Sequence, residues 1–245
     1  MADYNTIRTG AGTRAAEIDA GLRAHMNKVY GTMSVGLLLT AAVAWAVGST
    51  PALISMLYNL ETGSPNILGW IVMFLPLVMV FGFRSVLNRL SAAGTQLYFY
   101  VYAAMMGLSL SFIFLAFTGI SIAQTFLVTS ISFAGLSLWG YTTKKDISGW
   151  GAFLIMGLIG LIVASIVNIF LGSPALHFAV SVIGVLIFAG LTAYDTQRIK
   201  TDYIQHAQAM DTEWLAKSAI MGALNLYLDF INLFMFLLQF MGSRE

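Results

Sequence analysis

Long apolar stretches separated by short polar segments dominate the pattern of this chain. Seven of them approach the ~17–25 residues that a helix needs to cross the hydrocarbon core of a bilayer. None shows the strict alternation of a membrane β-strand, so each is predicted to be a helix. The predicted spans are Val29–Gly48, Ile67–Phe83, Leu97–Phe117, Ile122–Tyr141, Trp150–Leu171, Phe178–Gln197 and Ala219–Met241.

The composition agrees with lipid as the solvent. Of the 245 residues, 58% are hydrophobic and 9% are charged, whereas a soluble domain would be about 25% charged. The first apolar stretch exceeds the ~7–15 residues of a signal-peptide core, so we interpret it as a retained helix. We expect an all-α membrane domain at residues 27–245, after a cytoplasmic N-terminal arm at residues 1–26. Small residues such as Gly157, Gly160 and Gly184 are predicted at close helix contacts.

The basic residues predict the orientation of these spans. Eleven of the twelve Lys and Arg residues lie in the arm or in the loops after the second, fourth and sixth spans, and Arg244 lies in the tail. The positive-inside rule makes that side cytoplasmic. We therefore expect a multi-pass protein of the inner (plasma) membrane with its N-terminus in the cytoplasm and its C-terminus outside.

Two aspartates interrupt the last two spans. Asp195 lies in IFAGLTAYDTQRIK and Asp229 in GALNLYLDFINLFMFLL. An ionisable residue at membrane depth is costly and usually faces a bundle interior or a water-filled cavity. Asp229 shares one helical face with Gly222, Asn225 and Asn232, which follow spacings of three and four. The stripe indicates either a polar pathway or, for the two asparagines, hydrogen-bonded helix packing.

Two carboxylates in contact would titrate as a coupled pair, because both cannot ionise cheaply. Losing the last proton would leave two repelling charges that loosen the helix packing or attract a cation. Carboxylates with amide carbonyls suit Ca2+, so Asp195 and Asp229 are predicted to form a weak Ca2+ site.

Contact between the two aspartates is not assured by the pattern. Asp195 lies three residues before Arg198, and the alternative is that it pairs at the interface with Arg198 and Lys200. Asp229 lies twelve residues after Lys217. The carboxylates can meet if the sixth helix ends further into the cytoplasm, or if the seventh begins in the cytosol before Ala219.

Arg84 and Arg89 end the second span on the same predicted side. The simpler interpretation is ordinary anchoring at the membrane surface. The more specific interpretation is a latch, in which one arginine pairs with Asp195 or Asp229 and closes the pathway. Arginine suits that role because it stays charged and grips a carboxylate with two donors.

Enzyme and cofactor signatures are absent from the sequence, which has no phosphate-binding loop, dinucleotide fingerprint, hydrolase elbow or zinc-protease motif. Tyr194 and Asp195 fit the first half of the pattern of intramembrane aspartyl proteases. The second half of that pattern is Gly-x-Gly-Asp, and this chain has Leu226 and Leu228 in place of the two glycines. Lys217 lies at the edge of the last span, which argues against a retinal-binding lysine.

We expect no enzyme activity and no cofactor, and we interpret the basic arm as a topology determinant rather than a nucleic-acid surface. The histidines have no metal-ligand spacing: His25, His177 and His206.

Four segments resemble signatures of the Bax inhibitor family. They are KVYGTMSVGLLLTAAVAW, GYTTKKDISGWG, GLTAYDTQRIK and, most specifically, LYLDFINLF. The resemblance covers nearly the whole chain from about Met26, and the chain looks like a bacterial member. It implies a seven-helix fold with the last helix at the centre, surrounded by the other six.

The resemblance also implies a pH-sensitive, passive calcium leak with Asp195 and Asp229 as its sensor pair. Some members carry a latch arginine at the end of the second helix, and by spacing Arg89 matches that position better than Arg84. The second span lacks the acid that some members have there. The expected partners are the lipid bilayer, Ca2+ and protons.

Two other functions remain open on the sequence. One is a non-transporting membrane regulator or scaffold, acting with membrane-protein partners in stress response or quality control. The other is a proton-coupled cation exchanger, whose flux would depend on a proton gradient.

Overall fold

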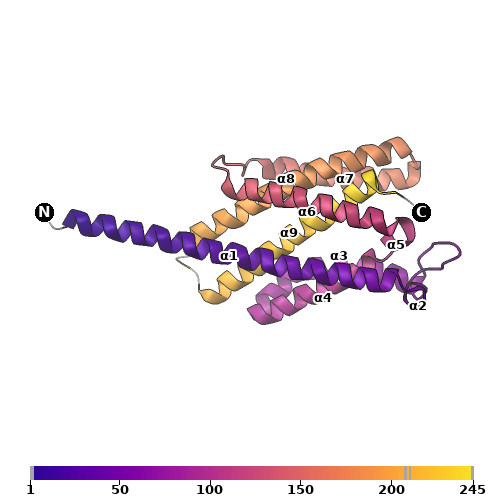
Figure 1. The fold of residues 1–245 in the computed structure, drawn as a ribbon, viewed down its shortest axis with the longest axis horizontal. Coiled ribbons are helices and arrows are strands. Elements are labelled where there is room, and N and C mark those ends of the chain that lie inside the picture. The colour runs from indigo at the N-terminus through magenta and orange to yellow at the C-terminus, as the bar shows by residue number, and fades with distance from the viewer. Residues whose placement is uncertain (1–2, 207–208, 210, 244–245) are drawn as a thin grey trace.

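The computed structural model describes residues 3–206, 209 and 211–243, with side chains described from residue 16 onward within those ranges. Throughout this part of the chain the regular structure is helical, without a named strand (Figure 1). The helices are α1 Asp3–Gly48, α2 Pro51–Ile54, α3 Ile67–Arg89, α4 Ala92–Leu110, α5 Ile113–Ala116, α6 Gly119–Thr142, α7 Trp150–Leu171, α8 Pro174–His206 and α9 Thr212–Met241.

Seven spans are long and apolar enough to cross a membrane, as the sequence predicts. They correspond to α1, α3, α4 together with α5, α6, α7, α8 and α9. The last two are longer than their apolar cores, because α8 continues to His206 and α9 begins at Thr212. Hydropathy could not reveal these polar turns. One signal for them is Asp211, whose side chain caps α9 by accepting a hydrogen bond from the Trp214 N–H at 2.7 Å.

The first span continues into the N-terminal arm without a break in the helix. α1 runs from Asp3 to Gly48, and its Leu22 and Met26 are buried in the same core as Val29. No backbone feature therefore marks the boundary expected after residue 26. The side chains of Arg8 and Arg14, and all of Arg244, lie outside the described part of the structure.

The long helices form two groups (Figure 1). α6, α7 and α8 lie on one side, α1, α3 and α4 on the other, and α9 runs between them. α9 packs against α1, α4, α6 and α8. In its most apolar window 61% of the residues are buried, against 11–44% in the other six spans. Enclosure of α9 by all six neighbours stays a prediction.

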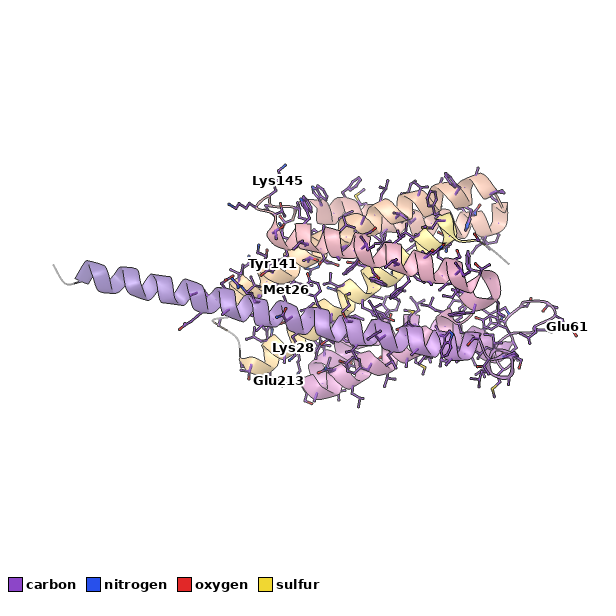
Figure 2. The ribbon with its side chains drawn as sticks, in the orientation of Figure 1. Met26, Lys28, Glu61, Tyr141, Lys145 and Glu213 are labelled. Atoms are coloured by element: carbon purple, nitrogen blue, oxygen red, sulfur yellow. The ribbon has the colours of Figure 1, made fainter. Side chains whose placement is uncertain are left out.

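The loops lie at two opposite ends of the molecule. We call the end with the α6–α7 and α8–α9 loops the inner end; Lys145 and Glu213 mark it in Figure 2. Glu61, in the loop before α3, marks the opposite, outer end. The described basic residues that the positive-inside argument uses therefore gather toward one end.

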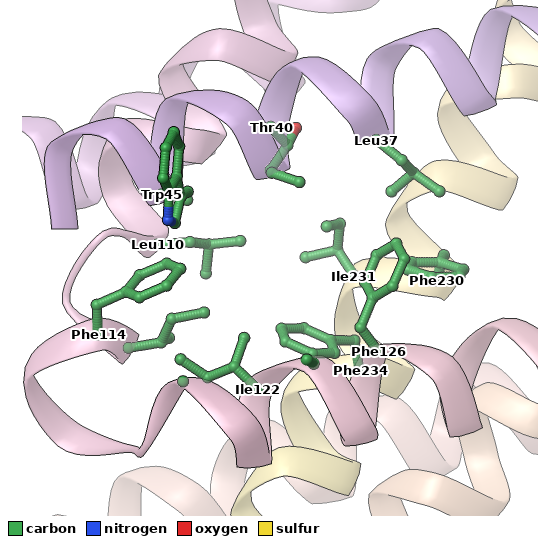
Figure 3. Close-up of a pocket in the computed structure, with 15 residues that line it drawn as sticks. Leu37, Thr40, Trp45, Leu110, Phe114, Ile122, Phe126, Phe230, Ile231 and Phe234 are labelled. Atoms are coloured by element: carbon green, nitrogen blue, oxygen red, sulfur yellow. The ribbon is translucent and has the colours of Figure 1, made fainter. Parts of the chain in front are cut away.

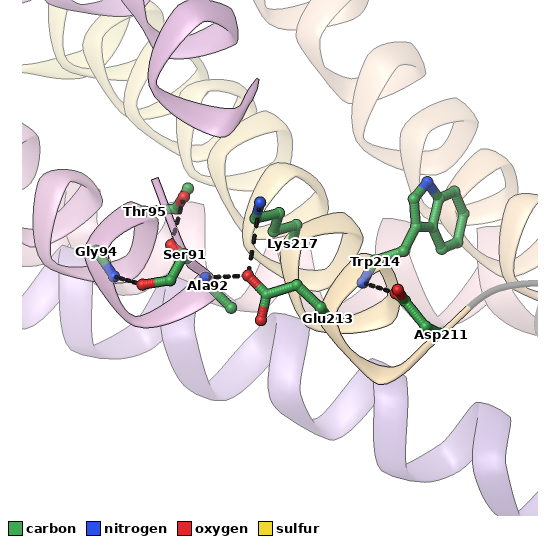
Figure 4. A network of polar contacts seen from close by, with 8 residues as sticks. All are labelled: Ser91, Ala92, Gly94, Thr95, Asp211, Glu213, Trp214 and Lys217. Atoms are coloured by element: carbon green, nitrogen blue, oxygen red, sulfur yellow. Dashed lines mark hydrogen bonds and ion pairs between the residues drawn. The ribbon is translucent and has the colours of Figure 1, made fainter. Parts of the chain in front are cut away.

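A charged contact at the inner end ties α9 to α4 (Figure 4). Glu213 accepts a hydrogen bond from the Ala92 N–H at 2.6 Å and forms an ion pair with Lys217 at 3.5 Å. Ser91 caps the same end of α4 by accepting from the Gly94 N–H at 3.3 Å. Lys217 is thus engaged by an acid at the surface rather than by the aspartates deeper in the helices.

Candidate functional site

α8 and α9, the most extensive helix pair, bring the two aspartates together. The carboxyl groups of Asp195 and Asp229 lie within hydrogen-bonding distance of each other. Two ionised carboxylates would repel at this separation, so the contact requires a proton between them. The unit to consider is therefore the pair and its shared proton, not either residue alone.

Helix length explains how they meet. α8 continues eleven residues beyond Asp195, and α9 begins seventeen residues before Asp229. Each helix therefore extends past its apolar core at the inner end, and these added turns allow the two carboxyl groups to meet.

The two carboxyl groups have different surroundings. Asp229 is 4% exposed, whereas Asp195 is half-buried. Apart from the contact with Asp195, Oδ2 of Asp229 has no hydrogen-bond partner among the described residues. A buried carboxyl with so few partners is costly, so packing alone does not explain it.

Arg198 is the cation that acts on Asp195. It is 58% exposed, and its Nε lies 3.9 Å from Asp202 Oδ2. Within the described residues Asp195 forms no ion pair. The alternative in which Asp195 pairs with Arg198 and Lys200 therefore leaves only a nearby charge on Arg198. Lys200 instead donates to the Tyr141 carbonyl at 2.7 Å.

Two cavities share Asn225 as a lining residue. The inner cavity, of about 550 Å3, lies between the inner ends of α1, α3, α8 and α9 and is lined by His25, Asn88 and Arg198 among others. The side crevice, of about 520 Å3, lies between α7, α8 and α9. Asn225 lines both, so one polar side chain of α9 lies between the cavity at the inner end and the crevice that holds the aspartates.

The predicted polar stripe of α9 lines these two cavities. Asn225, Asp229 and Asn232 all line the side crevice, and Gly222 lines the inner cavity. Asn232 donates from Nδ2 to the Leu228 carbonyl of its own helix at 2.8 Å. The asparagines therefore face the cavities.

An aromatic pair lies toward the outer end of the crevice. Phe188 and Phe236 stack with ring centroids 5.7 Å apart and line the crevice. The Phe236 ring lies so close to Gly184 that an added Cβ would come within 2.5 Å of it. Sequence analysis did not identify this pair, although Phe236 continues the stripe four residues after Asn232.

Beyond the aromatic pair lie polar groups. Ser181 Oγ is 3.5 Å from Gln239 Oε1, and His177 Nε2 is buried without a hydrogen-bond partner among the described residues. His177 lies one turn before Ser181 on the same face of α8. The Ser181 hydroxyl donates a hydrogen bond to the His177 carbonyl at 2.9 Å. The stacked rings therefore lie between two polar regions of the α8–α9 interface.

The two arginines proposed as a latch lie apart from the aspartates in this structure. Arg84 and Arg89 are exposed at the inner end of α3. Neither forms an ion pair with Asp195 or Asp229 in the described residues. A latch contact stays a prediction for a different conformation.

Sequence reasoning also missed a hydroxyl network beside Asp195. Tyr30 OH lies 2.6 Å from Ser137 Oγ, which lies 2.9 Å from Thr196 Oγ1, so α1, α6 and α8 are joined. A signal existed, because the buried hydroxyl residues of α6 repeat at multiples of four: Ser121, Thr125, Thr129 and Ser137.

A third cavity lies on another face of α9 (Figure 3). It measures about 350 Å3 and is lined by Leu37, Trp45, Phe126, Phe230 and Phe234 among others, from α1, α6 and α9. Its described lining includes no ionisable side chain. This apolar cavity shares no lining residue with the inner cavity or the side crevice.

The donor set around the aspartates is small. Over the described part of the chain, no group of three or more His, Cys, Asp or Glu side chains is placed to hold a metal ion. Ca2+ takes six to eight oxygen ligands, and two carboxyl groups with two amides reach the lower limit of that range only if both carboxylates bind through both oxygens. The arrangement suits transient contact with a hydrated cation.

Comparison with known proteins places this seven-span arrangement and its aspartate pair in a family. A model of the family described as inhibitor of apoptosis-promoting Bax1 matches residues 22–245. The chain belongs to the Bax inhibitor family. The family match begins within α1 and includes both aspartates.

Bacterial relatives align with this family member over nearly their full length. The inner membrane protein YbhL of Escherichia coli is 48% identical over 226 residues, covering 92% of this chain and 94% of the relative. An uncharacterized protein of Caulobacter vibrioides is 47% identical over 233 residues, covering 93% and 92%. One of Rickettsia prowazekii is 43% identical over 245 residues, covering all of both chains.

Proposed function

We propose that this protein is a passive, pH-sensitive calcium leak of the inner membrane, with Asp195 and Asp229 as proton sensor and cation contact. The observation that carries the proposal is the contact between two carboxyl groups inside membrane-spanning helices, beside a crevice that shares Asn225 with a cavity at the inner end. Structural packing alone gives no reason to bury a carboxylate pair.

The proposed gate works through charge. With one proton shared, the pair carries one negative charge and holds α8 against α9. When that proton leaves, the two carboxylates repel and attract a cation. Of the described ionisable groups, Arg198 is the cation that interacts with Asp195, and the α7 side of the crevice contributes none. The leak is therefore expected to rise as pH rises.

The proposed orientation follows from the basic residues. The N-terminus is cytoplasmic and the C-terminus is outside, so the inner cavity opens toward the cytoplasm. In this orientation Arg89, or Arg84, ends α3 on the cytoplasmic side and is our candidate latch in a closed conformation. The printed name of YbhL, an inner membrane protein, supports the same membrane.

We propose that the protein is not an enzyme and uses no cofactor. Leu226 and Leu228 lie three residues and one residue before Asp229, and they fill space that a protease would leave for a substrate backbone. Leu226 is fully buried. Ca2+ is the proposed cargo, and membrane-protein partners belong to the regulator alternative.

The test is Ca2+ entry into dye-loaded proteoliposomes from about pH 5 to about pH 8, a range that spans titration of a coupled carboxyl pair. Wild-type entry should rise with pH, and Asp195→Asn and Asp229→Asn should lose that dependence. Glu61→Gln, which removes an acid from an outer-end loop, is the matched control and should retain it. Folded wild-type protein with no entry above empty liposomes would favour the regulator or scaffold.

The same vesicles separate a leak from a proton-coupled exchanger. A leak depends on the Ca2+ gradient and on the pH at the site. An exchanger would move Ca2+ against its gradient when a proton gradient is imposed, and such uphill flux would replace the leak proposal with exchange.

A further inference from the structure

The side crevice is bordered by side chains that face the lipid. Ile162, Ile166 and Ile169 of α7 line it and are 52%, 51% and 78% exposed. In a membrane, surface exposed at these positions meets acyl chains. The same crevice is lined by Asp195 and Asp229. An acidic pair therefore lies beside an apolar wall that the bilayer can reach.

Packing leaves this lateral opening between α7 and α9. α7 packs along α8, whereas it makes few contacts with α9. Ser165 is the one hydroxyl that α7 contributes to the crevice, and it donates to the Leu161 carbonyl of its own helix at 2.7 Å. The α7 wall is thus apolar, and the polar groups are on α8 and α9.

We propose that the side crevice binds a single-chain amphiphile with a positively charged amine head group, which enters from the lipid. The ammonium group pairs with Asp195 and Asp229, and the alkyl chain lies against Ile162 and Ile166 of α7. Binding does not depend on the proposed calcium leak. Only the expected block of that leak rests on the proposed function.

Charge and donor number select this class of ligand. An ammonium group offers N–H donors and no acceptor, and Oδ2 of Asp229 has no partner in the described structure beyond the carboxyl pair itself. The amide oxygens of Asn225 and Asn232 line the same crevice and can accept further N–H groups. Attraction between ammonium and carboxylate is strong where water is scarce. A phosphate-bearing lipid brings negative charge, which the pair repels.

The apolar cavity of Figure 3 provides an internal contrast. It is bounded by Leu37, Phe126 and Phe234, and the described lining carries no charge that would distinguish an amine from an alcohol. The proposal therefore requires head-group selectivity at the side crevice and none at the apolar cavity.

The test is photo-crosslinking of the full chain in lipid nanodiscs, with a dodecylamine that carries a diazirine in its chain. Labelled peptides are mapped by mass spectrometry. Labelling should concentrate on α7 around Ile162 and Ile166, and excess unlabelled dodecylamine should remove it while dodecanol does not. Phe81 of α3, 79% exposed, reports non-specific labelling from the lipid in the same sample.

Variants separate the head-group contact from the crevice itself. The double variant Asp195→Asn/Asp229→Asn should reduce α7 labelling to the α3 level. Ser165→Trp fills the crevice and keeps both carboxylates, so it should have the same effect and remains informative if the double variant does not fold. Labelling of α7 that survives in folded forms of both variants, or equal competition by dodecanol, would overturn the proposal.

Calcium flux keeps the two proposals distinguishable. If wild-type protein leaks Ca2+, dodecylamine should reduce the leak more than dodecanol at equal concentration. If it does not leak but α7 labelling is amine-selective, the binding site stands and the leak proposal fails. If it leaks but labelling shows no amine selectivity, the leak stands and the binding site fails.

Discussion

Asp195 and Asp229 carry the same chemical group in unequal surroundings. Asp229 is almost fully buried, whereas Asp195 is half-buried and within the field of Arg198. Their presence in apolar segments was sufficient to predict both as site residues. Their contact was not predictable, because it depends on polar helical turns at the ends of α8 and α9 that hydropathy does not register.

Arg198 provides a test of the charge argument at the residue scale. Removing a positive charge beside two carboxyl groups makes loss of their proton harder, so Arg198→Gln should move the rise of the proposed leak to higher pH. The shift should be about one pH unit or less, because Arg198 is largely exposed and its charge is screened. The measurement is the midpoint of the pH–flux curve. Lys217→Gln, whose charge is engaged by Glu213, should leave the midpoint in place.

At the scale of the elements, small residues set how closely helices approach. Gly140 of α6 meets the backbone of Ala193 in α8, and Gly107 of α4 meets the backbone of Thr40 in α1. Two of the three glycines predicted at close contacts are there, because Gly157 meets Ile187 and Gly184 meets Phe236. The prediction for Gly160 was wrong: it has nothing within 4 Å.

Gly140→Ala should destabilise the helix pair that carries Asp195. Its new methyl group would meet backbone atoms of Ala193, which cannot rotate away as a side chain can. Overpacking of this kind costs about 1–3 kcal/mol, so the melting temperature in detergent should fall by several degrees. Gly160→Ala, facing open space on α7, is the matched control. Equal melting temperatures for the two variants would contradict the packing argument.

At the scale of the whole molecule, the bilayer makes much of the fold predictable. Backbone groups in lipid must be satisfied within each segment, so long apolar stretches become helices and their number can be read from hydropathy. Which faces meet is decided by side-chain packing. That is why the Phe188–Phe236 stack, the Tyr30–Ser137 contact and the separation of Arg89 from the aspartates were not visible in the sequence.

Phe236→Ala should weaken the closure between the aspartates and the outer end. On the proposed leak we expect a higher Ca2+ flux at every pH, with the rise at increasing pH preserved, because the change removes a stacked ring that lines the crevice and leaves both carboxyl groups in place. The measurement is proteoliposome flux. Phe240→Ala on the same helix removes a ring that is 48% exposed and lies against Phe178, so it should leave flux unchanged. A Ca2+ flux through Phe236→Ala equal to that of the wild type would show that this ring is not the barrier.

The uninterrupted α1 helix has a mechanical consequence. Its 46 residues contain no proline, and at 1.5 Å per residue they form a rod of roughly 70 Å, more than twice the ~30 Å thickness of a hydrocarbon core. Deep in the bundle the rod is fastened to the last helix, where Thr40 Oγ1 lies 2.7 Å from Tyr227 OH. Such a rod behaves as a lever: a sideways force at its long end is converted into torque at Tyr227, two residues from Asp229.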